Sequence, residues 1–177
     1  MSGHSKWAQI KHQKGVTDLR RGRVFSKLCA AITAAARGEP NPDFNPRLRD
    51  AILKAKQSQV PGENIERAVK RAAEAGAALE ELTLEAYGPG GTAILIEAIT
   101  DNRNRTIAEV KHVLVDHAGK WAEPGSVRWA FELAGEHGIW RAKFQQPVTG
   151  GDTEHLRALI KALEEHDDVQ RVFTSAA

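Results

Sequence analysis

The fold is decided by residues 82–100, which read LTLEAYGPGGTAILIEAIT. Residues 82–87 and 92–100 have the period and composition of extended chain, whereas the residues before them have a helical period. The segment Gly88-Pro89-Gly90-Gly91 between the two runs has the composition of a turn. These residues therefore predict a β-hairpin at the start of a sheet.

Downstream of the hairpin, helical and extended segments alternate. We expect a helix over residues 106–117, because Thr106-Ile107-Ala108-Glu109 has the form of a capping box. Strands are expected over residues 126–132 and 139–144, a helix over 152–165 and a last strand over 169–174. The order β, β, α, β, β, α, β predicts a two-layer α+β sandwich.

Upstream of the hairpin, apolar residues recur at helical spacing. They predict a helix over residues 18–37, a second over 46–59 with Asn45 as its N-cap, and a third from Pro61-Gly62 to near Gly76. Residues 1–16 lack this spacing and are expected to be a flexible basic arm. We therefore predict an α+β protein with that arm, a three-helix nucleic-acid-binding domain over residues 17–76 and an α+β sandwich domain over residues 77–177.

Charge is divided unequally along the chain. Residues 1–72 contain 15 Lys or Arg and 6 Asp or Glu, whereas residues 73–177 contain 10 and 17. The net charge of +2 hides this difference. The basic half is therefore expected to bind a polyanion, and the acidic half either to contact a protein partner or to keep the molecule soluble.

The composition disfavours several classes of protein. A single cysteine, Cys29, excludes an intrachain disulfide and a cysteine-based metal cluster, and its Ala-rich surroundings predict a small buried hydrophobe. No apolar run is long enough to span a bilayer, and no apolar segment follows the N-terminal cations as it would in a signal peptide. We therefore expect a cytoplasmic protein with no membrane partner.

The first 27 residues hold seven Lys or Arg and one acid, Asp18, with Trp7 among them. Cations bind phosphates and an indole stacks on bases, so this mixture favours nucleic acid over an acidic protein surface. A solubilising tail is the alternative, but such a tail needs no tryptophan. His4 and His12 are of a metal-ligand type, yet no third ligand has a suitable spacing, so no metal site is expected.

The order of residues in this segment adds a family resemblance. Residues 3–12, GHSKWAQIKH, resemble the opening of the YebC family, whose members are described as transcriptional regulators and are related to mitochondrial translational activators of cytochrome oxidase. Two later blocks are similar to that family's central and closing segments: YGPGG at 87–91 with TDNRNRT at 100–106, and LEEHDDVQ at 163–170. The resemblance implies a regulator of gene expression that binds nucleic acid.

The chain departs from the family near Ile139. Family members continue from that strand into a further α+β domain, whereas this chain passes almost directly to the closing helix and strand. The resemblance therefore implies a short form that lacks the third domain near residues 140–150. If that domain is an insertion, its loss leaves a complete sandwich.

Two loops are candidate sites. The Gly88–Gly91 turn lacks the Gly-Lys-Ser or Gly-Lys-Thr ending of a phosphate-binding loop and joins two strands, so a structural turn is favoured over a nucleotide cradle. Residues 101–105, DNRNR, precede a helix, where backbone amides and two arginines can hold a phosphate or an acidic side chain. The alternative is a helix cap whose arginines pair with Asp101 and nearby glutamates.

Catalytic residues are not evident. Ser126 lacks a nucleophile elbow, Cys29 has no evident base, and adjacent Asp167 and Asp168 point to different sides if extended. We expect a non-enzymatic regulator without a cofactor, and favour a translation factor bound to the ribosome or ribosomal RNA. A DNA-binding transcriptional regulator and a protein-interaction adaptor are the alternatives. The predicted nucleic-acid contacts are His4, Ser5, Lys6, Trp7, Lys11, His12, Lys14, Arg20, Arg21, Arg23, Lys27, Arg103 and Arg105.

Overall fold

The structure is a computed structural model that describes residues 3–74, 79–135 and 139–177, and the side chains from residue 17 onward. The chain forms two compact units, Met1–Ala77 and Ala78–Ala177, each with its own hydrophobic core. Within the described ranges, no helix combines the length and the apolar character that crossing a bilayer requires.

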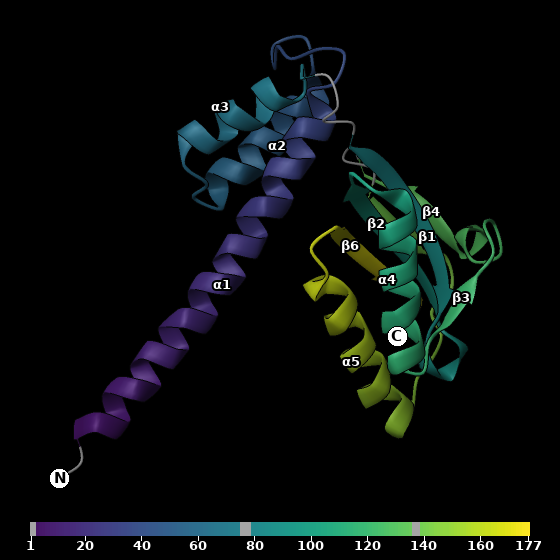
Figure 1. Cartoon of the computed structure of the whole chain (residues 1–177). Helices are drawn as coiled ribbons and strands as arrows, with labels where there is room; N and C mark the ends of the chain where they lie inside the picture. Colours follow the sequence, from purple (N-terminus) through teal and green to yellow (C-terminus); the bar gives the residue numbers. More distant parts are fainter. Residues whose placement is uncertain (1–2, 75–78, 136–138) are drawn as a thin grey trace. The chain divides into compact units, whose positions relative to one another are not determined.

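The first unit is a bundle of three described helices: α1 (Gly3–Ala35), α2 (Pro46–Gln57) and α3 (Gly62–Arg71) (Figure 1). Its core contains Ile32 from α1, Leu48 from α2 and Ile65 from α3, all nearly inaccessible to solvent. Asn45 caps α2 as predicted, because its side chain accepts from the Leu48 N–H at 3.0 Å. The same side chain donates to the Ala35 carbonyl at 2.7 Å, which joins the end of α1 to the start of α2.

The helix α1 begins at Gly3, well before the start predicted near Asp18. Hydrophobic spacing detects a helix only where one of its faces packs, and the described members of the core on α1 begin at Phe25. The residues before that point include good helix formers such as Ala, Gln, Lys, Leu and Arg, so the backbone stays helical without an apolar face.

The second unit contains a four-stranded antiparallel sheet in the order β3-β1-β2-β6. Its strands are β1 (Glu80–Tyr87), β2 (Ala93–Thr100), β3 (Lys120–Ala122) and β6 (Val169–Thr174). The predicted hairpin is confirmed, since Tyr87 pairs with Ala93 and Glu80 with Thr100. The last predicted strand has the predicted bounds.

The two faces of this sheet are covered differently. The helices α4 (Arg103–Asp116) and α5 (Gly151–Glu165) pack on one face, where Ile94 and Ile96 of β2 meet Leu114 and Leu159 (Figure 1). On the other face, Leu95 contacts a second core formed with the hairpin of β4 (Phe131–Ala134) and β5 (Ile139–Ala142). The α+β class is confirmed.

Glu85, a buried carboxylate on β1, explains why the strand predicted over residues 126–132 begins only at Phe131. It is 5% exposed and accepts backbone N–H bonds from Gly125 at 2.6 Å, Val127 at 2.6 Å and Arg128 at 2.8 Å. Because these N–H groups bond to Glu85, they are not available to a β-ladder. Residues Arg128–Ala130 form a short 3₁₀ turn, η2, and β4 begins after it at Phe131. Burial would raise the pKa of Glu85, but the three N–H bonds and Arg128 outweigh it and lower the pKa.

The Gly88–Gly91 loop is a closed structural turn, η1 (Pro89–Gly91). Two of its amides are used within the turn, because Gly88 N–H donates to Thr92 O at 2.8 Å and Gly91 N–H to Gly88 O at 3.0 Å. Gly90 and Gly91 have φ of 72° and 74°, which favours glycine at both positions. The loop is therefore a structural turn between two strands, which is the alternative that the sequence favoured over a nucleotide-binding loop.

Gly88→Ala is expected to lower the free energy of unfolding of this unit by about 1 kcal/mol through overpacking. A Cβ at Gly88 would lie 2.7 Å from Thr92 Oγ1, 2.8 Å from Ile94 Cδ1 and 2.9 Å from Leu156 Cδ1. Gly151→Ala is the matched control, because a Cβ there meets no atom within 4 Å. Urea unfolding of both variants checks the difference, and equal stabilities would show that the core yields to the extra methyl group.

Candidate nucleic-acid interface

The N-terminal part of α1 extends beyond the other two helices of its unit (Figure 1). Residues 3–24 precede Phe25, the first residue of the described side chains that packs in the core, and at about 1.5 Å per residue they span about 33 Å. Of the described side chains before Phe25, those of Leu19, Arg20, Arg21 and Val24 are exposed. This segment can therefore lie along a groove or enter an irregular cavity of another molecule.

Four of the predicted contacts lie in the described part of α1. Arg20 and Arg21 are exposed, while Arg23 and Lys27 are half-buried. Arg20, Arg23 and Lys27 share one face of the helix, because they are spaced by three and four residues. Arg21 lies 5.2 Å from the centre of the Phe25 ring, so its guanidinium is held against the helix by a cation–π contact.

The other contacts predicted on this segment are His4, Ser5, Lys6, Trp7, Lys11, His12 and Lys14. Their backbone is part of α1, but their side chains lie outside the described residues. Their role in binding stays a prediction.

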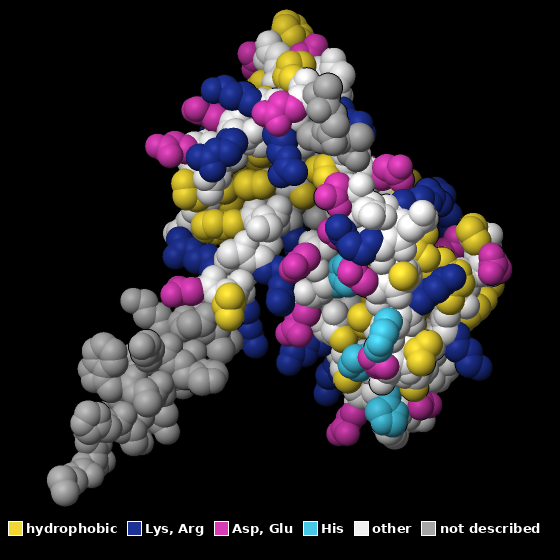
Figure 2. All heavy atoms as spheres, in the orientation of Figure 1, with side chains coloured by type: hydrophobic (Ala, Val, Ile, Leu, Met, Phe, Trp, Pro, Cys, Tyr) yellow, Lys and Arg dark blue, Asp and Glu magenta, His cyan; other side chains and the backbone are white. Residues whose placement is uncertain are grey.

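The rest of the first unit adds further cations. Figure 2 shows Lys and Arg side chains over the visible face of this unit, with Asp, Glu and hydrophobic side chains between them. The first turns of α3 are less favourable for phosphates, because Glu63 and Glu66 are exposed there. The N-terminal residues of a recognition helix enter the DNA groove, where these two carboxylates would be repelled by the phosphates.

Arg103 and Arg105 lie at the start of α4, which begins three residues before the predicted cap at Thr106. The cap is Asn102, whose side chain accepts from the Arg105 N–H at 3.1 Å, so the predicted capping box is wrong. Arg103 is 4.0 Å from Glu80 in a solvent-exposed pair. Arg105 lies 2.9 Å from Asp101, 3.0 Å from Asp168 and 3.9 Å from Glu109. A phosphate at Arg105 would have to compete with these three carboxylates.

Asp168 joins the start of α4 to the segment before β6. Its Oδ2 accepts from the Thr106 hydroxyl at 2.6 Å and from Arg105 at 3.0 Å, and Thr106 itself is fully buried. The Thr100 and Thr106 hydroxyl oxygens lie 2.8 Å apart, so the end of β2 belongs to the same network. Burial would raise the pKa of Asp168, but the hydrogen bonds from Thr106 and Arg105 outweigh it and lower the pKa.

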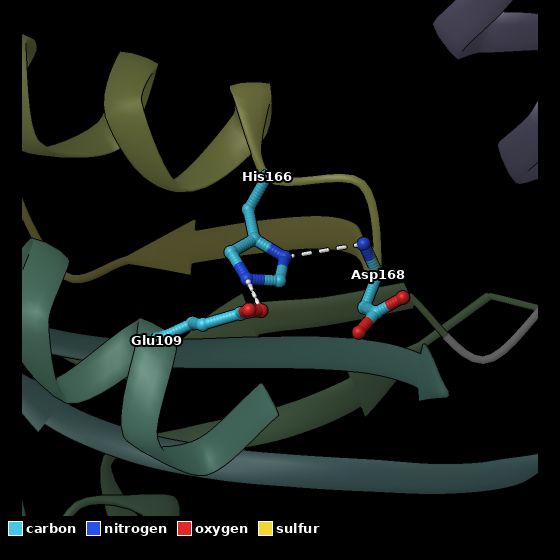
Figure 3. A group of neighbouring side chains, drawn as sticks. All are labelled: Glu109, His166 and Asp168. Atoms are coloured by element: carbon cyan, nitrogen blue, oxygen red, sulfur yellow. Dashed lines mark hydrogen bonds and ion pairs between the residues drawn. The ribbon is translucent and has the colours of Figure 1, made fainter. Parts of the chain in front are cut away.

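His166 and Glu109 extend this network, as Figure 3 shows. The Asp168 N–H donates to His166 Nδ1 at 3.1 Å, so the hydrogen of the neutral ring is on Nε2, which donates to Glu109 Oε2 at 3.0 Å. Ligand atoms of Glu109, His166 and Asp168 lie within 4.8 Å of one another, a spacing that would suit a metal ion. Each residue is already hydrogen-bonded, and the Arg105 guanidinium beside Asp168 opposes a cation. The network is better suited to holding α4 against β6.

Cys29 does not have the surroundings of a nucleophile. Burial raises the pKa of its thiol, with Arg67 opposing that change in part, and its Sγ lies 4.0 Å from the Asn64 carbonyl. A thiol with a raised pKa is mostly protonated at neutral pH and therefore unreactive. Its partial burial in the core between α1 and α3 agrees with a packing role.

Comparison with known proteins decides the family. Residues 5–75 match the TACO1/YebC protein N-terminal domain, and residues 79–146 match the TACO1/YebC second and third domain. A probable transcriptional regulatory protein from Dictyoglomus thermophilum is 51% identical over an alignment that covers 99% of this chain and 95% of that protein. The chain belongs to the TACO1/YebC family. The resemblance found in the three sequence blocks is confirmed.

The relatives differ from this chain in length. It spans 56% of a probable transcriptional regulatory protein from Acidobacterium capsulatum, at 50% identity, and 62% of one from Solibacter usitatus, at 52% identity. The Dictyoglomus alignment has 237 positions, of which at least 60 have no counterpart in this chain of 177 residues. The absence of the third TACO1/YebC domain stays a prediction, and this difference in length agrees with it.

The fold is that of a solved relative. A conserved hypothetical protein from Aquifex aeolicus matches with a TM-score of 0.84 and 33% sequence identity, over 90% of this chain and 91% of that one. Two of the sequence blocks that resemble the TACO1/YebC family, residues 100–106 and 163–170, meet in the Thr106–Asp168 contact.

Sequence reasoning missed Glu85 and His166. A glutamate between the apolar residues Leu84 and Ala86 of β1 was the available signal for Glu85. His166 stood within a block that resembled the family, but its partner Glu109 lies 57 residues earlier and could not be identified from spacing.

Proposed function

We propose that this protein is a non-enzymatic nucleic-acid-binding regulator whose first unit holds the polyanion through α1. The observation that carries the proposal is a long helix, α1, that runs through the most basic segment of a chain whose other half is acidic. Cations on such a helix displace the counterions of a phosphate backbone, which is the main source of affinity for nucleic acid.

The physiological ligand that we propose is RNA on the ribosome, with a role in translation. Trp7 within the cationic segment suits unstacked bases, which folded RNA offers and regular duplex DNA does not. The acidic start of α3 argues against a recognition helix of the helix-turn-helix type.

A DNA-binding transcriptional regulator is the second candidate. The relatives carry the name of probable transcriptional regulatory proteins. A single α-helix also fits the major groove of B-DNA, which is about 12 Å wide, better than the deep groove of A-form RNA.

The test is cosedimentation of the full chain with ribosomes in the presence of excess duplex DNA. We expect Lys6→Gln, Lys11→Gln and Lys14→Gln together to weaken ribosome binding about tenfold and to flatten the slope of log affinity against log salt by about 2 to 3. The matched control is Lys54→Gln, Lys56→Gln and Lys70→Gln, which removes the same charge from exposed positions on α2 and α3.

Each outcome separates the candidates. Binding that falls in the α1 variant and persists in the control supports contact through α1. Transfer of the unaltered chain to the DNA fraction would favour promoter binding instead. Equal losses in both variants would mean that charge in general, and not α1, determines the affinity. Failure to bind either polymer at physiological salt would favour a protein-interaction adaptor.

A further inference from the structure

Two aromatic side chains of the second unit lie on its surface. Trp129 in η2 and Phe144 after β5 are 63% and 65% exposed. Their ring centroids lie 6.4 Å apart with the planes tilted by 51°. The Trp129 Nε1–H donates to the Ser126 carbonyl at 2.8 Å, which satisfies the polar edge of the indole and fixes the ring. Large aromatic rings are usually buried, so an exposed and oriented pair suggests a ligand.

The segments that carry these rings are basic within an acidic unit. Residues 124–131 and 139–149 contain Arg128, Arg141 and Lys143 and no Asp or Glu, whereas the rest of residues 78–177 contains 7 Lys or Arg and 16 Asp or Glu. All three cations are exposed. Arg141 is paired with Glu132 at 2.7 Å, and Arg128 lies 5.1 Å from the centre of the Trp140 ring. Within these two segments the only charged residues are cations, although Glu123 and Glu132 flank the first of them, and this favours a polyanion over an apolar protein partner.

We propose that Trp129 and Phe144 form a stacking platform for single-stranded nucleic acid, with Arg128 and Lys143 contacting its phosphates. Aromatic faces beside cations bind unpaired bases with little regard to sequence, because every base has a π-face. Paired bases are stacked inside a duplex and cannot reach such a platform. The inference rests on the proposed function and adds to it a second contact, on the acidic unit that was expected to face a protein partner or to serve solubility.

The test is the affinity of the full chain for a fluorescent oligouridine of about 12 nucleotides, a length within the usual range of site sizes. Trp129→Ala is expected to weaken this binding about five- to thirtyfold, while Trp129→Phe retains most of it because a ring remains. Affinity for a duplex of the same length is expected to stay unchanged in both variants. Phe44→Ala is the matched control, since Phe44 is a 76% exposed ring of the first unit.

Several results would overturn the platform. One such result is that the unaltered chain and Trp129→Ala bind oligouridine equally, whereas the Lys6, Lys11 and Lys14 variant binds it less. It would contradict the platform and leave the proposal for α1 intact. Loss in Trp129→Phe as large as in Trp129→Ala would show that the indole hydrogen bond matters and stacking does not. A lower molecular mass of the free protein in Trp129→Ala, with unchanged affinity, would assign the rings to contact between copies of the chain. No binding of oligouridine or duplex by the unaltered chain would overturn the proposed function as well.

Discussion

Glu85→Ala is expected to lower the free energy of unfolding of the second unit by about 3 kcal/mol. The substitution leaves the N–H groups of Gly125, Val127 and Arg128 without their acceptor. In the unaltered protein Glu85 is only 5% exposed, so little water reaches that site. The bond from Val127 is buried and the other two are partly buried, and a buried donor left unpaired costs more than the net strength of the bond that it loses. Urea unfolding followed by tryptophan fluorescence measures the effect in a Trp7→Phe background, because the other three tryptophans belong to this unit.

Glu123→Ala is the control for this experiment, since Glu123 is exposed and close to the same loop; a change within about 0.5 kcal/mol is expected. Glu85→Gln removes the negative charge at nearly constant shape. It also replaces one accepting oxygen with an amide nitrogen, which would face one or more N–H donors without accepting from them. A loss below about 1 kcal/mol in Glu85→Ala would contradict the anchoring role.

The pH dependence of the same variants has a definite sign. The pKa of Glu85 is lowered by folding, so its contribution to stability is complete above the unfolded pKa and is lost as the pH falls through the folded value. The stability difference between the unaltered chain and Glu85→Gln should therefore be full at pH 7 and shrink below about pH 4. A difference that grows on acidification would contradict this account.

Asp168→Ala is expected to lower the free energy of unfolding by about 2 kcal/mol. It removes the acceptor of the buried Thr106 hydroxyl and of Arg105, and so disconnects α4 from the segment before β6. The measurement is again urea unfolding in the Trp7→Phe background.

Asp101→Ala is the matched control for Asp168→Ala. Asp101 lies 2.9 Å from the same Arg105, but its side chain is 62% exposed, against 17% for Asp168. An exposed ion pair contributes little, so a loss within about 0.5 kcal/mol is expected. A double-mutant cycle with Thr106→Val should give a coupling of about 1 kcal/mol between Thr106 and Asp168. Additive effects would mean that the 2.6 Å contact adds nothing to stability.

Much of the fold was predictable because it depends on neighbours in sequence. Alternation and a glycine-rich turn predicted the hairpin of β1 and β2, and the side chain of Asn45 predicted the start of α2. The α+β class followed from the order of these local patterns.

The errors occurred where distant residues decide the outcome. Thr106 is of a residue type that often caps a helix, but its hydroxyl donates a hydrogen bond to Asp168, which lies 62 residues later. The strand predicted from Ser126 is replaced by a turn because Glu85, some 40 residues earlier, takes the N–H groups. For the candidate site, composition predicted the cationic segment, but it could not reveal that α1 continues through it as one helix.

The strand order β3-β1-β2-β6 also bears on how the protein is made. β6 is the last described strand in the chain, yet it pairs with β2, whose Ile94, Leu95 and Ile96 are completely buried. During synthesis, the first unit and the β1–β2 hairpin leave the ribosome while the edge of β2 still lacks its neighbour. An unpaired, strongly apolar strand edge invites association with other chains. The edge of β2 therefore stays open to such association until residues 169–174 emerge, and a slow translation step before them would prolong that exposure.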